Sequence, residues 1–273
     1  MPIEKVWAYT YGNVTKLFQF KLKLPHLCVV SENEKDGRWI NWHALTIGEH
    51  FIKLGRVKLF EFSPQHMVKY NEPSKYLTEQ YIGFFNDILN VLPCLSCPMP
   101  EDLYRLVDTK GKIEVLWEKI WRYGDNRIIE KLRLNLIAYG GLETLSWNGG
   151  SHLQFFRVHD NVNFHYDLTC KDETNIPEWT ADKGIYTLAY ETFLSEVECL
   201  LNRFFLEMEK QLTLTSKTFT QQELKRANLT ATHAEKKKYF YDIWDNVKQG
   251  KYENSIDWQQ VRTDLAYVLE NRK

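Results

Sequence analysis

The sequence predicts an α+β fold, in which an antiparallel sheet is covered by helices and followed by a helical C-terminal segment. Three observations support this class. Residues 16–62 alternate apolar and polar side chains with the two-residue period of strands. Residues 153–168 show the same period on both sides of a short turn, which is the pattern of a hairpin. Much of the chain from residue 73 onward spaces its apolar residues three and four apart, as amphipathic helices do.

The N-terminal strands are expected to form a meander. Alternate positions of residues 16–24 are consistently apolar, and Pro25 closes this strand. Short strands follow between residues 39 and 62, punctuated by Gly48 and Gly55. Because the connections are too short for helical crossovers, the strands are expected to be antiparallel and to form one sheet together with the hairpin.

The expected helices are bounded by prolines, glycines and capping residues. Pro73 suits the first turn of a helix, and Pro93 is expected to stop it. Asp125 can cap a later helix, which Gly140 and Gly141 end in the left-handed conformation. Before residue 213 the helices are expected at residues 73–92, 101–107, 113–123, 125–137 and 188–212.

The chain is expected to consist of an α+β main domain, residues 1–212, and a helical C-terminal extension, residues 213–273, docked on it. Five of the eight residues from Thr213 to Thr220 are Ser or Thr, which is typical of a connector. Thr220 and Glu223 then have the spacing of a capping box. An extension of this size is near the lower limit for independent folding, so docking is favoured.

Composition excludes several classes of function. The 35 basic and 36 acidic residues nearly cancel, so the chain lacks the basic balance of nucleic-acid-binding proteins. No apolar run approaches the roughly 20 residues of a membrane helix, and the N-terminus is unlike a signal peptide. The odd number of cysteines, five, fits reduced thiols. A cytoplasmic protein with neither a nucleic-acid nor a membrane partner is therefore expected.

No motif predicts a catalytic centre, a metal site or a cofactor. Cys94 and Cys97 have the spacing of redox and zinc sites, but no second cysteine pair completes a zinc site. Their position after a predicted helix is also wrong for a redox pair, which needs a helix N-terminus. Phosphate-binding loops and hydrolase signatures are absent from the sequence. No catalytic residues and no bound group are expected.

The hairpin carries a row of polar side chains that is the best candidate for a working surface. Asn163, His165 and Asp167 lie on one face of its second strand, and Arg157 lies opposite or diagonal to them on the first strand. We expect this face to be exposed and the other to be packed. A recognition surface is the favoured interpretation, and an acid–base site built from His165 and Asp167 is the alternative.

Two tryptophans add a second candidate contact surface. Trp39 and Trp42 are large amphipathic groups, which supply contact area in interfaces, although a half-buried sheet edge explains them equally well. The predicted partner-binding residues are Arg157, Asn163, His165, Asp167, Trp39 and Trp42.

Two stretches resemble an uncharacterised bacterial family of unknown function. Residues 42–52, WHALTIGEHFI, resemble its W-x-x-L-T-x-G strand pair. Residues 155–164, FFRVHDNVNF, resemble its F-x-R-x-x-D-x-V-x-I hairpin, with His159 in place of Gly and Phe164 in place of Ile. Similar hairpins occur in immunity proteins that accompany polymorphic bacterial toxins. The resemblance extends over residues 15–212 and implies no catalytic residues.

The preferred function is therefore a non-catalytic bacterial interaction protein, such as an immunity-type inhibitor that binds a toxin or effector. The alternative is a hydrolase or nuclease that uses His165, Asp167 and a further histidine. Three ionisable side chains converging within hydrogen-bond distance in a pocket would favour the enzyme. An outward row without a concavity would favour the binding protein.

Overall fold

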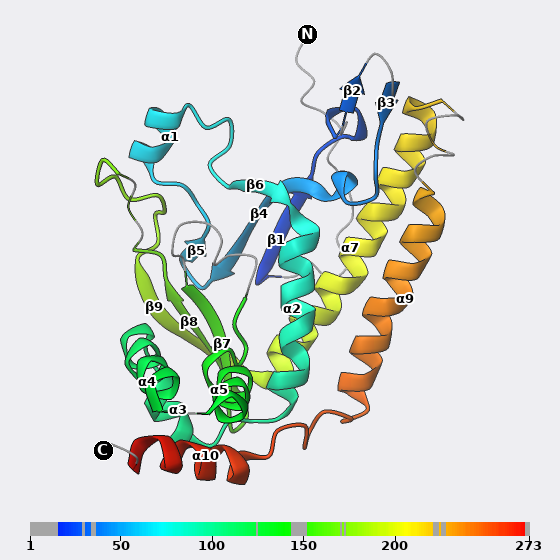
Figure 1. The fold of residues 1–273 in the computed structure, drawn as a ribbon. Coiled ribbons are helices and arrows are strands. Elements are labelled where there is room, and N and C mark those ends of the chain that lie inside the picture. Colours follow the sequence, from blue (N-terminus) through cyan, green and yellow to red (C-terminus); the bar gives the residue numbers. More distant parts are fainter. Residues whose placement is uncertain are drawn as a thin grey trace.

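The computed structural model describes residues 16–28, 31–33, 37–123, 125–142, 152–169, 171, 173–220, 224 and 228–270. It confirms the α+β class: two antiparallel sheets lie beside a layer of long helices, and shorter helices cover the lower end of the second sheet (Figure 1). None of the helices in these ranges is both long and apolar enough to cross a membrane.

The first sheet is built from the N-terminal strands. Its members are β1 (Phe18–Leu22), β4 (Ile47–Leu54), β5 (Val57–Leu59) and β6 (Leu77–Gln80), all antiparallel. β4 is central, because β1 pairs along one of its edges while β5 and β6 share the other. A separate two-stranded ribbon contains β2 (Ser31–Asn33) and β3 (Gly37–Trp39).

The two glycines of the meander have different roles. Gly55 has a φ of +62° and forms the turn between β4 and β5, as expected. Gly48, in contrast, lies inside β4, so the expected break there is wrong. A Cβ atom on Gly48 would lie 2.8 Å from the Cα of Leu22 in β1. Glycine therefore allows β1 to approach β4 closely.

The second sheet contains the predicted hairpin. β7 (His152–Val158) and β8 (Asn161–Asp167) pair through a turn at His159 and Asp160, and β9 (Lys183–Ala189) adds to the far edge of β8. His159 has a φ of +52°, which requires a residue that tolerates the left-handed region. The period-two pattern thus predicted the hairpin correctly.

The expectation of one sheet shared by the meander and the hairpin is wrong. Phe60 has a φ of +68°, and the chain after it runs beside the segment that leads into β6, where Glu61 bridges Tyr76. Phe62 then forms an isolated antiparallel bridge with Trp179, in the loop before β9. The rings of these two residues stack at 4.8 Å. This bridge joins the two sheets, which remain separate ladders.

The first long helix, α2 (Tyr81–Ser96), differs from its prediction at both ends. It does not start near Pro73, because residues 77–80 form strand β6 on the edge of β4. Pro93 does not stop it either but lies inside the helix. Leu77 and Tyr81 are four residues apart, a spacing that puts two side chains on the same face of a helix and also on the same face of a strand. The apolar pattern alone therefore could not distinguish β6 from the start of α2.

α1 (Pro64–Tyr70), which buries no side chain, was not predicted, whereas the other helices before residue 213 overlap their predicted ranges. α7 extends to Thr218, so the Ser/Thr-rich segment expected to be a connector is mostly helical, and the capping box at residue 220 falls largely outside the described residues. The division of domains at residue 213 stays a prediction. The remaining elements are α1 (Pro64–Tyr70), α3 (Glu101–Val107), α4 (Lys110–Tyr123), α5 (Asn126–Leu132), the π-helical turn η3 (Arg133–Ile137), α7 (Tyr190–Thr218), α9 (Leu229–Lys248), α10 (Trp258–Glu270) and the 3-10 turns η1 (Pro25–Leu27) and η2 (Ala44–Thr46).

The core is a continuous aromatic cluster centred on α7. Phe193 packs against Phe18 of the first sheet, with ring centroids 6.4 Å apart, and against Phe155 and Phe164 of the second, at 5.9 and 5.8 Å. Both sheets therefore pack against one helix. Phe240 of α9 also lies in this cluster.

One histidine is sealed in this core. His50 of β4 is fully buried between aromatic rings and stacks on Phe84 at 5.2 Å. Among the described residues, neither of its ring nitrogens has a hydrogen-bond partner of normal geometry, and Glu79 Oε1 is 3.7 Å from Nε2. Burial lowers the pKa of His50 to about 4, so the imidazole is neutral in the folded protein at physiological pH.

The close packing at the end of η3 predicts a severe effect of one glycine substitution. Gly140 has a φ of +62°, and a Cβ atom there would overlap the backbone carbonyl group of Phe155 in β7. We expect Gly140→Ala to lower the free energy of unfolding by at least about 3 kcal/mol. Gly111 in α4 is the matched control, because a Cβ there meets no atom within 4 Å. Gly111→Ala should raise stability by up to about 1 kcal/mol, as urea unfolding can measure.

The buried imidazole predicts a loss of stability in acid. Unfolded His50 takes up a proton below its ordinary pKa near 6.5, whereas folded His50 does so only near pH 4, so acid favours unfolding across that interval. The largest contribution is about 3 kcal/mol, reached near pH 4. His50→Phe should lose less stability than the wild type between pH 7 and pH 4.5. The exposed His26 supplies the control: His26→Phe should follow the wild-type curve, and an identical slope for His50→Phe would refute the argument.

Candidate functional site

The predicted polar row is divided between the two faces of the second sheet. Asn163, His165 and Asp167 share one face, as expected from their spacing. Arg157 pairs directly with Val162, so it lies on the opposite face, and the expectation that it lies near His165 or Asp167 is wrong. Side chains alternate between the two faces along β7. Arg157 is an odd number of residues away from the β7 residues that pair with Asn163, His165 and Asp167, so it must lie on the other face.

The expectation that His165 is displayed to solvent is also wrong. Its side chain is 5% exposed because α3 covers this face of the sheet. The Tyr104 hydroxyl of α3 is 2.8 Å from His165 Nε2. Burial lowers the pKa of His165 to about 4 and raises the pKa of Tyr104 to about 12. This pair is therefore neutral at physiological pH and joins α3 to the sheet.

The other two members of the row are partly exposed and are bound locally. Asn163 Oδ1 accepts a hydrogen bond of 2.6 Å from Thr187 of β9. Asp167 Oδ1 accepts hydrogen bonds from the backbone and hydroxyl groups of Thr169. These contacts lower the pKa of Asp167 against the opposing effect of burial. The imidazole and the carboxylate of the row thus have different partners.

The tryptophans do not form an exposed pair. Trp42 is 2% exposed, and its Nε1 donates to Nδ1 of His233 in α9 at 3.4 Å. Its predicted exposure as a contact surface is therefore wrong. Trp39 ends β3, but its side chain lies outside the described residues.

The cysteine pair lies at the end of α2. Cys94 is in its last turn and Cys97 caps it, so the pair is at a helix C-terminus, as the sequence indicated. Burial raises the pKa of the Cys94 thiol. Both thiols are free, and within the described ranges no group of three His, Cys, Asp or Glu side chains is placed to hold a metal ion.

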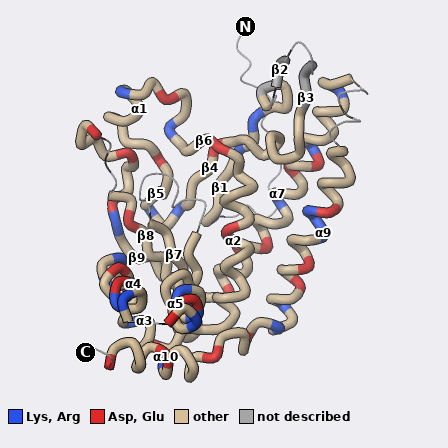
Figure 2. Tube along the Cα trace, viewed as in Figure 1, with Lys and Arg blue, Asp and Glu red and all other residues tan. Residues whose placement is uncertain are grey.

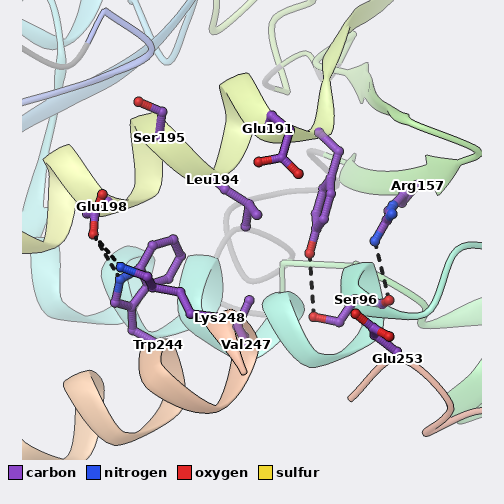
Figure 3. A pocket seen from close by; sticks show the side chains of 11 residues that line it. Ser96, Arg157, Glu191, Leu194, Ser195, Glu198, Trp244, Val247, Lys248 and Glu253 are labelled. Carbon is purple, nitrogen blue, oxygen red and sulfur yellow. Dashed lines mark hydrogen bonds and ion pairs between the residues drawn. The ribbon is translucent and has the colours of Figure 1, made fainter. Parts of the chain in front are cut away.

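A half-open hollow of about 440 Å³ lies where four separate segments meet (Figure 3). Its walls come from the end of α2, the end of β7, the first turns of α7 and the last turn of α9 with the segment that follows it. The lining residues are Ser96, Arg157, Tyr190, Glu191, Leu194, Ser195, Glu198, Trp244, Val247, Lys248 and Glu253. Arg157 is the predicted site residue among them.

Arg157 forms the end of the hollow next to α2. Its Nη1 donates to the carbonyl oxygens of Leu95 and Ser96 at 3.2 and 3.3 Å, and its Nε donates to the carbonyl of His159 at 3.1 Å. The guanidinium carbon lies 3.7 Å from the centre of the Tyr190 ring. Arg157 thus satisfies carbonyls at the C-terminus of α2 and stacks on the first residue of α7.

The opposite end is formed by α7 and α9. Glu198 accepts hydrogen bonds from Trp244 Nε1 at 3.4 Å and from Lys248 Nζ at 3.2 Å (Figure 3). Trp244 and Val247 are buried, and Leu194 is half-buried, so they supply an apolar floor. Glu191, Ser195 and Glu253 are exposed at the rim.

Sequence patterns could not have assembled this site. Tyr190 and Trp244 were indistinguishable from core aromatics because both lie on apolar faces of helices. Their convergence depends on the packing of α9 against α7, which no local spacing encodes.

Comparison with known proteins places the chain in a family. Residues 17–264 match a family of unknown function (DUF5984). No curated protein and no solved structure matches the chain. The matched residues include both sheets, α2, α7 and α9, and therefore every residue of the hollow. The expected similarity to an uncharacterised family is confirmed, and the chain belongs to this family of unknown function.

Proposed function

We propose that this protein is an interaction protein whose hollow binds a segment of a protein partner. The observation that carries the proposal is the composition of the hollow. Arg157, Tyr190 and Trp244 are of the three residue types most enriched among the residues that dominate binding energy. Trp244 forms an apolar floor together with Val247 and Leu194, and charged side chains lie at the rim, which is the arrangement of a protein interface.

The hollow is also positioned on rigid elements. Tyr190 and Trp244 are on the long helices α7 and α9, and Arg157 is held by three backbone carbonyls. A site whose side chains are already ordered loses little conformational entropy on binding. The geometry therefore supports binding without rearrangement of the fold.

The narrower proposal is an immunity-type inhibitor of a bacterial toxin or effector, acting in the cytoplasm. It rests on the resemblance of the hairpin to those of immunity proteins. Arg157 connects the two proposals, because it belongs both to that hairpin motif and to the hollow.

Blocking the hollow tests the proposal. Ser195 is exposed on α7 at the rim, so Ser195→Trp should fill the hollow without disturbing the core. We expect the variant to bind a partner captured from native lysate at least about tenfold more weakly than the wild type. Calorimetry with the purified partner would measure the change in Kd.

The matched control is Ser216→Trp, an exposed position on the same helix outside the hollow. It should bind the partner with the wild-type Kd, and both variants should keep the wild-type melting temperature. Equal affinity of Ser195→Trp and the wild type would show that the partner binds elsewhere.

A further inference from the structure

The charge of the hollow follows from the residues that line it. Along the backbone of α7 and α9, both acidic and basic residues occur (Figure 2). The hollow itself is lined by three carboxylates, Glu191, Glu198 and Glu253, and by two cations, Arg157 and Lys248. One negative charge is therefore in excess at this site.

The cations are already engaged by groups of this chain. Lys248 pairs with Glu198 at 3.2 Å, and the Arg157 guanidinium donates to the carbonyls at the end of α2. Glu191 and Glu253 have no ion pair within the part of the chain that the structure describes, and both are exposed at the rim. The unmatched charge of the hollow is thus carried by carboxylates.

The partial charges of the helix ends at the hollow are also negative in sum. α2 and α9 both end at the hollow, and a helix C-terminus carries roughly half a negative charge. Of the helices that the structure describes, α7 alone begins there, and Glu191 lies in its first turn, at the positive end of the helix. The charges of the side chains and the partial charges of the helix ends add to a negative total. The electrostatic potential in the hollow therefore favours a cation over an anion.

We propose that the hollow takes a lysine or arginine side chain from a basic segment of the partner protein. This inference rests on the proposed function, because it specifies the partner of the same site. The aliphatic stem of such a side chain would pack on Leu194 and Val247, while its charge would lie between Glu191 and Glu253. A carboxylate ligand would instead meet these two glutamates unpaired.

Glu253 is held at the rim by a turn that begins at a glycine in the left-handed conformation. Gly250 ends α9 with a φ of +68°, and the Glu253 amide donates to its carbonyl at 3.2 Å. A Cβ atom on Gly250 would lie 2.8 Å from Glu253 Oε1, so the turn brings this carboxylate against the end of α9. The position of the carboxylate is therefore a consequence of the fold.

Titration of the full chain with peptides tests whether the hollow prefers a positively or a negatively charged ligand. The probe is a blocked peptide, acetyl-Gly-Lys-Leu-Lys-Gly-amide, and its control carries Glu in place of both lysines. The readout is the NMR signal of the Trp244 indole N–H, which Trp244→Phe identifies. We expect the lysine peptide to shift this signal at concentrations up to about 5 mM, with binding weakened when salt rises from about 50 to 500 mM. The glutamate peptide should leave it unchanged.

Matched variants assign the effect to the two carboxylates. Glu191→Gln and Glu253→Gln should each weaken the lysine peptide about threefold, and the double variant about tenfold. Glu235→Gln, an exposed position on α9 outside the hollow, should leave the Kd unchanged.

Three results would overturn the inference: no shift with the lysine peptide, a shift with the glutamate peptide, or full binding by the double variant. If Ser195→Trp still abolished binding of a captured partner in any of these cases, the hollow would remain the binding site and only the assignment of a cationic ligand would fail. If Ser195→Trp bound that partner normally, the proposed function itself would fail.

Discussion

The packing of the aromatic face of α7 is the interaction on which the rest of the structure depends. Phe193 contacts both sheets, and Phe204, further along the same face, stacks on Phe85 of α2 at 4.2 Å. Phe205 then contacts Phe240 of α9 at 5.9 Å. Two sheets that share no ladder and a C-terminal helix are thereby assembled on a single helix. Burial of these rings is favoured by the hydrophobic effect and fixes how the elements pack on α7.

Strong local periodicity predicted much of this fold. The hairpin, α3, α7 and the cap of α5 by Asp125 all follow from spacing or from a capping residue whose chemistry acts locally. Strand β6 was missed because it has only four residues directly ahead of a helix, too few to show a two-residue period. The separation of the sheets was missed because the alternation of apolar and polar residues does not specify which strands pair with each other.

The candidate site was less predictable than the fold. Alternation identified correctly which residues of β8 share a face, but it could not show that α3 docks on that face and buries His165. A polar side chain on a strand is exposed only if no other element covers it, and that is decided by tertiary packing. Arg157 was recognised as a candidate for the wrong reason, since it lies away from His165 and Asp167 and contacts α2 and α7 as well as the turn of its own hairpin.

Arg157 also has a consequence for thermodynamic linkage. The same guanidinium closes the C-terminus of α2, holds the end of β7 and forms a wall of the hollow. An occupant of the hollow would thus contact a residue that connects the hairpin with the long helices. Because these contacts exist only in the folded chain, occupancy would raise the free energy of unfolding in proportion to the logarithm of ligand concentration. A bound occupant would therefore also oppose unfolding of the hairpin from the long helices.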